Sequence, residues 1–374
     1  MSFHIPCPAE PGMALADVDT PALLLDMDAF DSNLDRMEAS LAGSAMRLRP
    51  HAKSHKCPEI ALRQMARGAV GVCCQKVTEA EAMVAGGIPD VLISNQVVGK
   101  RKIARLMALA QRGRVSVLVD DATNVAALND AASQHGVTLS VLVEVNVGAN
   151  RCGVPAGEAA CTLARAVASS KNLHFRGIHA YQGSAQHVRS AQERQALIAS
   201  AVEMVRETIT LLNAAGIDCE IVTGAGTGTY LFEAASKVYN ELQPGSYIFM
   251  DADYAKNLDA DGNPVQAFSH SLFIWTSVMS HTKPGRAVVD AGLKALSVDS
   301  GMPVVAQEGA QYLGASDEHG VLEVEDASSF PLGHKLRLIP GHCDPTVNLH
   351  DWIVGYRGHT VEAVWPVTAR GALF

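Results

Sequence analysis

The sequence predicts a (β/α)8 barrel followed by a mostly antiparallel C-terminal β domain. Between residues 45 and 251, eight short apolar runs alternate with longer Ala-, Leu- and Glu-rich stretches, which is typical of parallel strands joined by crossover helices. Beyond about residue 256, runs such as SHSLFIWTSVMSH and HTVEAVWPV follow one another with little helical pattern between them. A doubly wound open sheet is the alternative, but the count of eight favours the barrel.

Each of the eight predicted strands is short and rich in apolar or β-branched residues. In chain order they are 45–53, 69–76, 90–95, 115–120, 140–147, 175–183, 220–226 and 245–251. Between them, apolar residues recur at three- and four-residue steps, and several of these stretches end in Gly, as helices commonly do. The earlier run TPALLLDM, 20–27, could pair into the second domain. We therefore predict a barrel over 28–256 and a β domain formed by 1–27 and 257–374.

Composition and charge argue against several classes of protein. A net charge of −9 disfavours nucleic acid as a partner, although the segment RLRPHAKSHK, 47–56, is a basic exception. No apolar run reaches the roughly 18 residues of a membrane span, and the N-terminus has no signal-peptide pattern. The eight cysteines include no CxxC pair, which fits reduced thiols. We expect a cytoplasmic protein that binds neither membrane nor nucleic acid.

Polar side chains gather at the carboxyl ends of the predicted strands, where barrel enzymes hold their active sites. They include Lys53, Gln75 and Tyr181, Arg151 shortly after the fifth strand, and Tyr247 in the eighth. One such residue means little, because capping residues occupy the same positions. A ring of them predicts a binding site.

A glycine-rich turn, TGAGTGTY, follows the seventh predicted strand. Its glycines would let backbone N–H groups point inward, and its threonines would add hydroxyl groups. Barrels commonly bind a phosphate at this place, so the turn predicts an anion site, with a plain tight turn as the equal alternative. The residues concerned are Thr223, Gly224, Gly226, Thr227 and Gly228.

Lys53 ends the first predicted strand, inside the basic segment. Most lysines are simply exposed, but a lysine enclosed at a barrel mouth loses hydration, so we expect a lowered pKa and a nucleophilic amine. An amine and a phosphate site together suit pyridoxal 5′-phosphate (PLP), which needs a lysine for its Schiff base. Arg151 would then stabilise negative charge on the cofactor's ring oxygen; a surface ion pair is its alternative. Lys56 is expected to face away.

His342 and Asp344 flank a cysteine in PGHCDPT. In an extended chain, residues two apart point the same way, so one imidazole and one carboxylate would share a divalent metal with open coordination positions. A lone HxD is a weak motif and is more often a loop without metal.

Several motifs together resemble the D-threonine aldolase family, a branch of the alanine-racemase-like PLP enzymes. They are RPHAKSHK, GVCCQKVTEAEAMVAGG, NRCGV, TGAGTGTY, VVDAGLKA, DEHG and PGHCDPT. Within this group, CCQKVTEAEA, AYQG and LKALSVDSG are similar to 3-hydroxy-D-aspartate aldolases. The resemblance implies a homodimer with PLP on Lys53, Arg151 at the ring oxygen, and Mg²⁺ or Mn²⁺ on His342 and Asp344.

The implied reaction cleaves a D-3-hydroxy amino acid into glycine and an aldehyde, which is glyoxylate for 3-hydroxy-D-aspartate and acetaldehyde for D-threonine. Gln186 and His187 are candidates to bind a second substrate carboxylate. A dehydratase is the nearest alternative, but dehydrating relatives tend to have H-x-C, whereas Asp344 fills that place here. A racemase, a PLP-binding protein without turnover, and a metallohydrolase without PLP are more distant alternatives.

Overall fold

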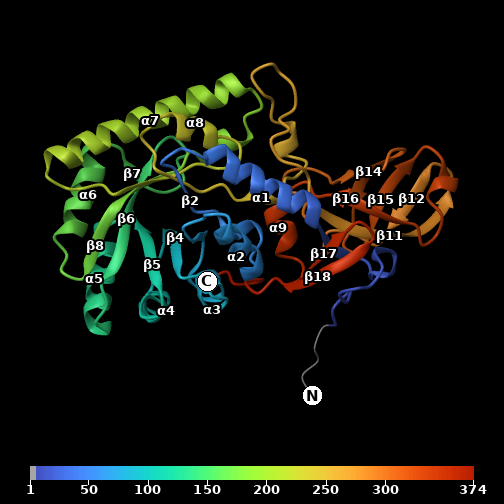
Figure 1. Ribbon diagram of the computed structural model, residues 1–374, viewed down its shortest axis with the longest axis horizontal. Coiled ribbons are helices and arrows are strands. Elements are labelled where there is room, and N and C mark those ends of the chain that lie inside the picture. Colours follow the sequence, from blue (N-terminus) through green and yellow to red (C-terminus); the bar gives the residue numbers. More distant parts are fainter. Residues whose placement is uncertain (1–5) are drawn as a thin grey trace.

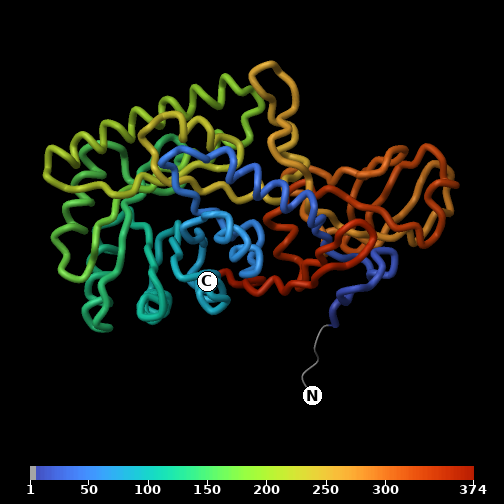
Figure 2. Tube along the Cα trace, in the orientation of Figure 1, coloured from blue at the N-terminus to red at the C-terminus, as the bar shows by residue number. Residues whose placement is uncertain are grey.

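The barrel sheet has eight parallel strands on its main path in the computed structural model, which describes residues 6–374. Their order is β2, β10, β9, β8, β6, β5, β4, β3. The edge strands meet because Val70 N donates to Leu48 O and Cys73 N donates to Pro50 O, both at 2.8 Å, so the sheet curls back on itself (Figures 1 and 2). The strands are β2 (Arg47–Leu48), β3 (Val72–Cys74), β4 (Asp90–Gln96), β5 (Arg114–Val119), β6 (Leu139–Asn146), β8 (Leu173–Ala180), β9 (Ile221–Gly224) and β10 (Glu241–Leu242), with the short β7 (Val154–Pro155) beside β6.

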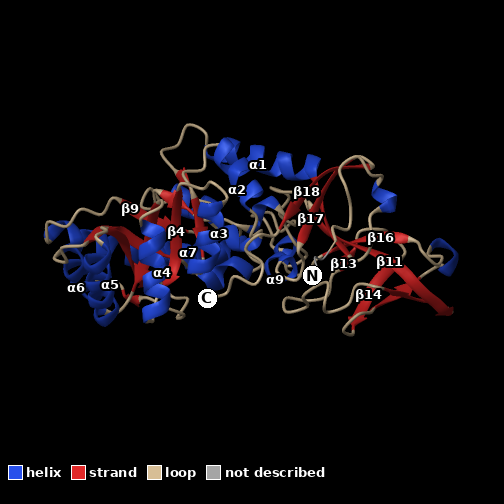
Figure 3. Ribbon diagram, turned by 90° about the horizontal axis from the view of Figure 1, so that it is seen from below, coloured by secondary structure: helices blue, strands red, loops and turns tan. Residues whose placement is uncertain are grey.

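Helices cover the outer face of this sheet, as Figure 3 shows for α3 to α7. Local signals set their ends. Asp121 caps α5 by accepting hydrogen bonds from the backbone N–H groups of Thr123 and Asn124, and Gly136, in the left-handed conformation at φ +64°, ends it. The helices are α2 (Pro58–Ala66), α3 (Val77–Ala85), α4 (Lys100–Ala110), α5 (Ala122–His135), α6 (Glu158–Ala168), α7 (Ala191–Ala214) and α8 (Tyr230–Ala235).

The barrel interior changes from apolar to polar along the strands. One buried cluster consists of Cys73, Leu92, Leu118, Leu142 and Ile221. Because side chains two residues apart on a strand share a face, the next inward layer follows two residues later. That layer is polar: Gln75, Ser94, Asp120, Glu144 and Thr223. The interior therefore has an apolar floor and a polar mouth at the carboxyl ends of the strands.

The second sheet is mostly antiparallel, which with the barrel confirms the predicted fold class. Its strand β1 comes from the run at 20–27 and pairs antiparallel with β11 and parallel with β17. The boundaries proposed for the two domains stay a prediction. The strands are β1 (Ala22–Asp26), β11 (Leu272–Lys283), β12 (Arg286–Val289), β13 (Val304–Val305), β14 (Ala310–Ala315), β15 (Gly320–Val324), β16 (Lys335–Ile339), β17 (Trp352–Arg357) and β18 (Thr360–Pro366).

Two helices lie between the barrel and the second sheet, α1 (Met27–Leu41) and the short α9 (Cys343–Val347), as Figure 1 shows. One buried cluster contains Phe30 of α1, Leu272 of β11 and Cys343 of α9, together with Tyr247 and Phe249. This shared core fixes α9 against the barrel mouth. Within residues 6–374, no helix is both long and apolar enough to cross a membrane.

Two of the strand predictions were wrong in detail. The run at 245–251 contains a 3-10 helix, Ser246–Ile248, and the eighth strand is instead the short β10 just before it. The run is apolar because Tyr247, Ile248 and Phe249 are buried in the core, and a short apolar run does not distinguish strand from other buried structure. The first strand ends at Leu48, so Lys53 lies beyond it.

Candidate active site

A cavity opens at the polar mouth of the barrel, between the strand ends and the segment that leads to the second sheet. Six of the residues predicted for the site line it: Lys53, Gln75, Arg151, Tyr181, Gly226 and Thr227. His51, Ser94 and His179 also line this cavity. The structure thus brings together residues at the ends of six strands, β2, β3, β4, β6, β8 and β9, as the barrel rule requires.

Lys53 lies in a 3-10 helix, Ala52–Ser54, that follows β2. Its Nζ contacts Oδ2 of Asp344 in α9, and its side chain is 39% exposed. Burial lowers the pKa of Lys53, but the negative charge of Asp344 more than offsets this and the pKa is raised. The expected lowering of the pKa was therefore wrong, because the sequence does not show which carboxylate the fold places beside the amine.

His51 was missed as a site residue, although it stands two positions before Lys53. It is buried, and burial together with the charge of Lys53 holds its pKa well below the usual value, so the ring is neutral. Its Nδ1 accepts a hydrogen bond from Lys53 N at 3.3 Å, and its Nε2 lies 3.0 Å from Ser94 Oγ. Gln75 Nε2 lies 2.9 Å from the same Nε2. His51 therefore orients the segment that carries the lysine.

The glycine-rich turn packs tightly against Gln186. A Cβ added at Gly226 would lie 2.4 Å from Gln186 Oε1, and one at Gly228 would lie 2.6 Å from Gln186 O. Thr227 Oγ1 is buried and has no hydrogen-bond partner. A buried hydroxyl without a partner is destabilising, and a phosphate oxygen would satisfy it. The turn therefore fits a phosphate group.

Four predicted cofactor residues do not line the cavity: Thr223, Gly224, Gly228 and Tyr247. Thr223 is fully buried and accepts a hydrogen bond from Gln243 Nε2 at 2.7 Å. Gly224 serves strand packing, because a Cβ there would lie 2.2 Å from Ala180 O. Tyr247 is buried in the core behind the site, where its hydroxyl accepts from Gln64 at 3.2 Å.

Gln186 does not act as a free donor to a ligand. It is fully buried, its Nε2 donates to Thr229 Oγ1 at 2.8 Å, and its Oε1 accepts from Gly228 N at 3.0 Å. These bonds use the amide to support the glycine-rich turn. The neighbouring His187 is 46% exposed, and its Nδ1 lies 2.6 Å from Asp253 Oδ2.

Arg151 and Tyr181 lie together at the cavity. The guanidinium carbon of Arg151 is 5.6 Å from the centre of the Tyr181 ring, a distance typical of a cation–π contact. Burial raises the pKa of Tyr181, so its hydroxyl is protonated near neutral pH. The pair presents one fixed cation and one hydroxyl to a bound molecule.

His342 and Asp344 approach the cavity from the second sheet. They do not lie in one extended segment as expected: His342 is the N-cap of α9 and Asp344 lies in its first turn, where Pro345 is tolerated because the N–H groups there have no partner within the helix. Asp251 Oδ2 accepts from Cys343 N at 3.0 Å and holds this end in place. Burial raises the pKa of Asp344, but Lys53 and His342 more than offset this and lower it to about 2, so the carboxylate is ionised.

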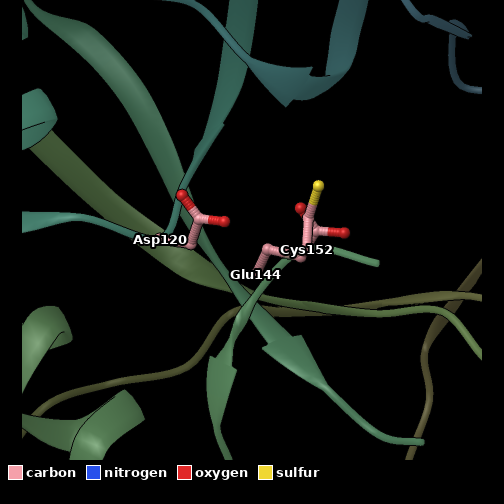
Figure 4. A group of neighbouring side chains, drawn as sticks. All are labelled: Asp120, Glu144 and Cys152. Carbon is pink, nitrogen blue, oxygen red and sulfur yellow. The ribbon is translucent and has the colours of Figure 1, made fainter. Parts of the chain in front are cut away.

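A second group of metal-ligating residues lies at the rim near Arg151. The ligand atoms of Asp120, Glu144 and Cys152 are all within 4.8 Å of one another (Figure 4). Asp120 Oδ2 accepts from Gly153 N at 3.0 Å, so this carboxylate holds the loop that follows β6. The group is separate from His342 and Asp344.

The family comparisons agree with this architecture. Residues 25–253 match the alanine racemase N-terminal domain, and residues 271–356 match the putative serine dehydratase domain. The 3-hydroxy-D-aspartate aldolase of Paracoccus denitrificans is 50% identical over 369 residues, which are 97% of this chain and 95% of that protein.

Two further relatives have higher and lower sequence identity to this chain. The crystal structure of D-threonine aldolase from Filomicrobium marinum has a TM-score of 0.96 and 53% identity, covering 98% of this chain and 100% of that one. The D-threo-3-hydroxyaspartate dehydratase of Delftia sp. is more distant, at 28% identity over 89% of this chain and 92% of its own. The chain belongs to the family of D-threonine and 3-hydroxy-D-aspartate aldolases, which are carbon–carbon lyases with an alanine-racemase-like fold.

Proposed function

We propose that the protein is an aldolase that uses PLP and a divalent cation, Mg²⁺ or Mn²⁺, to cleave D-3-hydroxy amino acids. The observation that carries this proposal is the contact between Lys53 Nζ and Asp344 Oδ2. It places the amine that would hold PLP beside the carboxylate that would hold the cation. A substrate with an amino group and a hydroxyl group on neighbouring carbons would meet both.

Residues of this chain fit the cofactor. Lys53 would bond the aldehyde of PLP, Thr227 and the turn around Gly226 would hold its phosphate, and Arg151 and Tyr181 would contact its ring. The unpartnered hydroxyl of Thr227 supports this assignment. Bound there, PLP supplies an electron sink for the cleaved bond, and a divalent cation lowers the pKa of a coordinated hydroxyl.

His187 is the proposed acceptor of the proton from the substrate hydroxyl. Its Nδ1 faces Asp253 at 2.6 Å, which leaves Nε2 with a free lone pair, and its ring centre is 5.0 Å from that of Tyr254, a residue that lines the cavity. Asp253 would stabilise the charged ring after proton transfer, as a carboxylate does for a general base. Binding of a second substrate carboxylate by His187 is the alternative role.

Product analysis tests the proposed reaction. The purified protein with PLP and Mn²⁺ is given D-threonine and both diastereomers of 3-hydroxyaspartate, and products are followed in parallel. Glycine with acetaldehyde or glyoxylate is the expected result. A 2-oxo acid with ammonia would show a dehydratase instead, and an unchanged substrate pool would favour a PLP-binding protein without turnover.

The proposed assembly is a homodimer, which the family resemblance suggests. Light scattering of the purified protein would measure twice the 39.5 kDa mass of the chain. A monomer mass at micromolar concentration would contradict the dimer without affecting the proposed reaction. The cytoplasmic location stays a prediction.

A further inference from the structure

Asp299 lies in the loop between β12 and β13, beside the imidazole of His342. Its Oδ2 is 2.7 Å from His342 Nδ1. The side chain of His342 is 26% exposed and that of Asp299 is 49% exposed, so solvent reaches the pair but does not surround it. Ser300 Oγ donates to the same carboxylate oxygen at 3.2 Å.

The loop that carries Asp299 is fastened to α9. Ser297 Oγ donates to Asp299 Oδ1 at 2.7 Å, and Ser297 N donates to Thr346 Oγ1 at 3.2 Å. Thr346 Oγ1 in turn donates to His342 O at 2.8 Å. Hydrogen bonds through Ser297 and Thr346 thus connect the Asp299 carboxylate to the backbone of His342. These hydrogen bonds keep the two side chains close to each other.

The two chain segments also approach closely at their backbones. A Cβ added at Gly341 would lie 2.1 Å from Gly301 O. Only glycine allows this approach. The positions next to His342 and Asp299 are therefore fixed relative to each other by packing as well as by hydrogen bonds.

The contact determines which imidazole nitrogen is free. The Asp299 carboxylate accepts hydrogen bonds from Ser297 Oγ and Ser300 Oγ, and its Oδ2 lies 2.7 Å from His342 Nδ1. Because this carboxylate acts as an acceptor, His342 Nδ1 carries the proton of the contact. Nε2 then has the lone pair that a metal ligand needs.

We propose that Asp299 is a positioning residue for His342, which holds Nδ1–H so that Nε2 binds the divalent cation. This inference rests on the metal site in the proposed function. A carboxylate behind a metal-bound histidine orients the ring and makes it a stronger donor, and loss of such a partner typically weakens metal binding about 10-fold to 100-fold.

The test is a Mn²⁺ titration of the PLP-loaded Asp299→Asn variant, with free Mn²⁺ followed by electron paramagnetic resonance. The expected result is an affinity about 10-fold to 100-fold below wild type, with unchanged PLP absorbance. Turnover should return at saturating Mn²⁺, which a misfolded variant would not show. Asp317→Asn is the matched control, because it removes one negative charge at an exposed residue in the turn between β14 and β15 and should leave the affinity unchanged.

His342→Ala separates this inference from the proposed function. If His342→Ala loses Mn²⁺ binding while Asp299→Asn and Asp299→Ala both bind like wild type, the positioning role is overturned and the metal site stands. If His342→Ala binds Mn²⁺ like wild type, the metal site in the proposed function fails, and the role of Asp299 fails with it.

Discussion

The ion pair between Lys53 and Asp344 predicts that PLP and the divalent cation bind cooperatively. Lys53 Nζ contacts the carboxylate oxygen Oδ2 of Asp344, and the proposed site needs both atoms for other partners. An ammonium group and a divalent cation compete for one carboxylate. Bonding of Nζ to PLP removes this competition, so each ligand should raise the affinity for the other by the same factor.

The size of the effect follows from the pKa of Asp344. Burial raises this pKa, yet Lys53 and then His342 lower it from 3.8 to about 2. At about 1.4 kcal/mol per pKa unit, the ionised carboxylate is stabilised by about 2 kcal/mol, with the Lys53 charge as the main favourable contribution. A cation that must displace the ammonium group should therefore bind roughly 30-fold more weakly.

Mn²⁺ titrations of three forms measure this effect: the PLP-loaded wild type, the PLP-free wild type and the PLP-free Lys53→Ala variant. The PLP-free wild type should bind roughly 30-fold more weakly than the loaded enzyme, and Lys53→Ala should restore the affinity without PLP. Lys294→Ala, which removes an exposed lysine paired with Glu318, is the control. Equal affinities in PLP-free wild type and PLP-free Lys53→Ala would refute the competition.

Further predictions concern the cofactor, the metal and pH. Lys53→Ala should abolish both Schiff-base absorbance and turnover, and retained absorbance at full intensity would contradict its assignment. EDTA should remove activity but not colour, and Asp344→Ala should behave likewise, measured by aldehyde release and absorbance. Gly226→Ala places a Cβ against Gln186 and should weaken PLP binding roughly 10-fold in a titration, since overpacking costs about 1–3 kcal/mol, whereas Gly314→Ala, in open space, should not. The pKa of Asp344 is depressed, so its contribution of about 2 kcal/mol to the free energy of unfolding is present above about pH 4 and is lost as pH falls toward 2. Acid unfolding of the PLP-free wild type should show this loss of stability, and acid unfolding of Asp344→Asn should not.

Local patterns predicted the barrel because its strands and helices differ in period and length. The short strands were harder: β2 and β10 have two residues each, and tertiary pairing rather than propensity makes them strands. The apolar run around Tyr247 was correctly predicted to be buried, but it was wrongly predicted to be a strand. Its side chains fill the core between the two sheets, which no local period reveals.

In the site, too, local sequence predicted some features, while others depend on residues that are far apart in the chain. Lys53 and Thr227 follow strands, so their place at the barrel mouth could be inferred. The pKa of Lys53 depends on Asp344, 291 residues away. The extended geometry expected around Asp344 was wrong because a short helix begins at Cys343, which the HxD spacing does not reveal. Gln186 looked like a ligand donor because the sequence does not show that its amide is already used.

The contact between Lys53 of the barrel and Asp344 of α9 also indicates which class of substrate the site suits. Bound to Lys53, PLP supplies the electron sink for chemistry at the α-carbon of an amino acid, and racemisation there has no use for a divalent cation. His342 and Asp344 stand at the start of α9, which follows β16 of the second sheet and lies next to that lysine. A cation there has a use only if the substrate carries an oxygen on the next carbon. The position of Asp344 against Lys53 therefore favours a 3-hydroxy amino acid over a simple amino acid, before any product is measured.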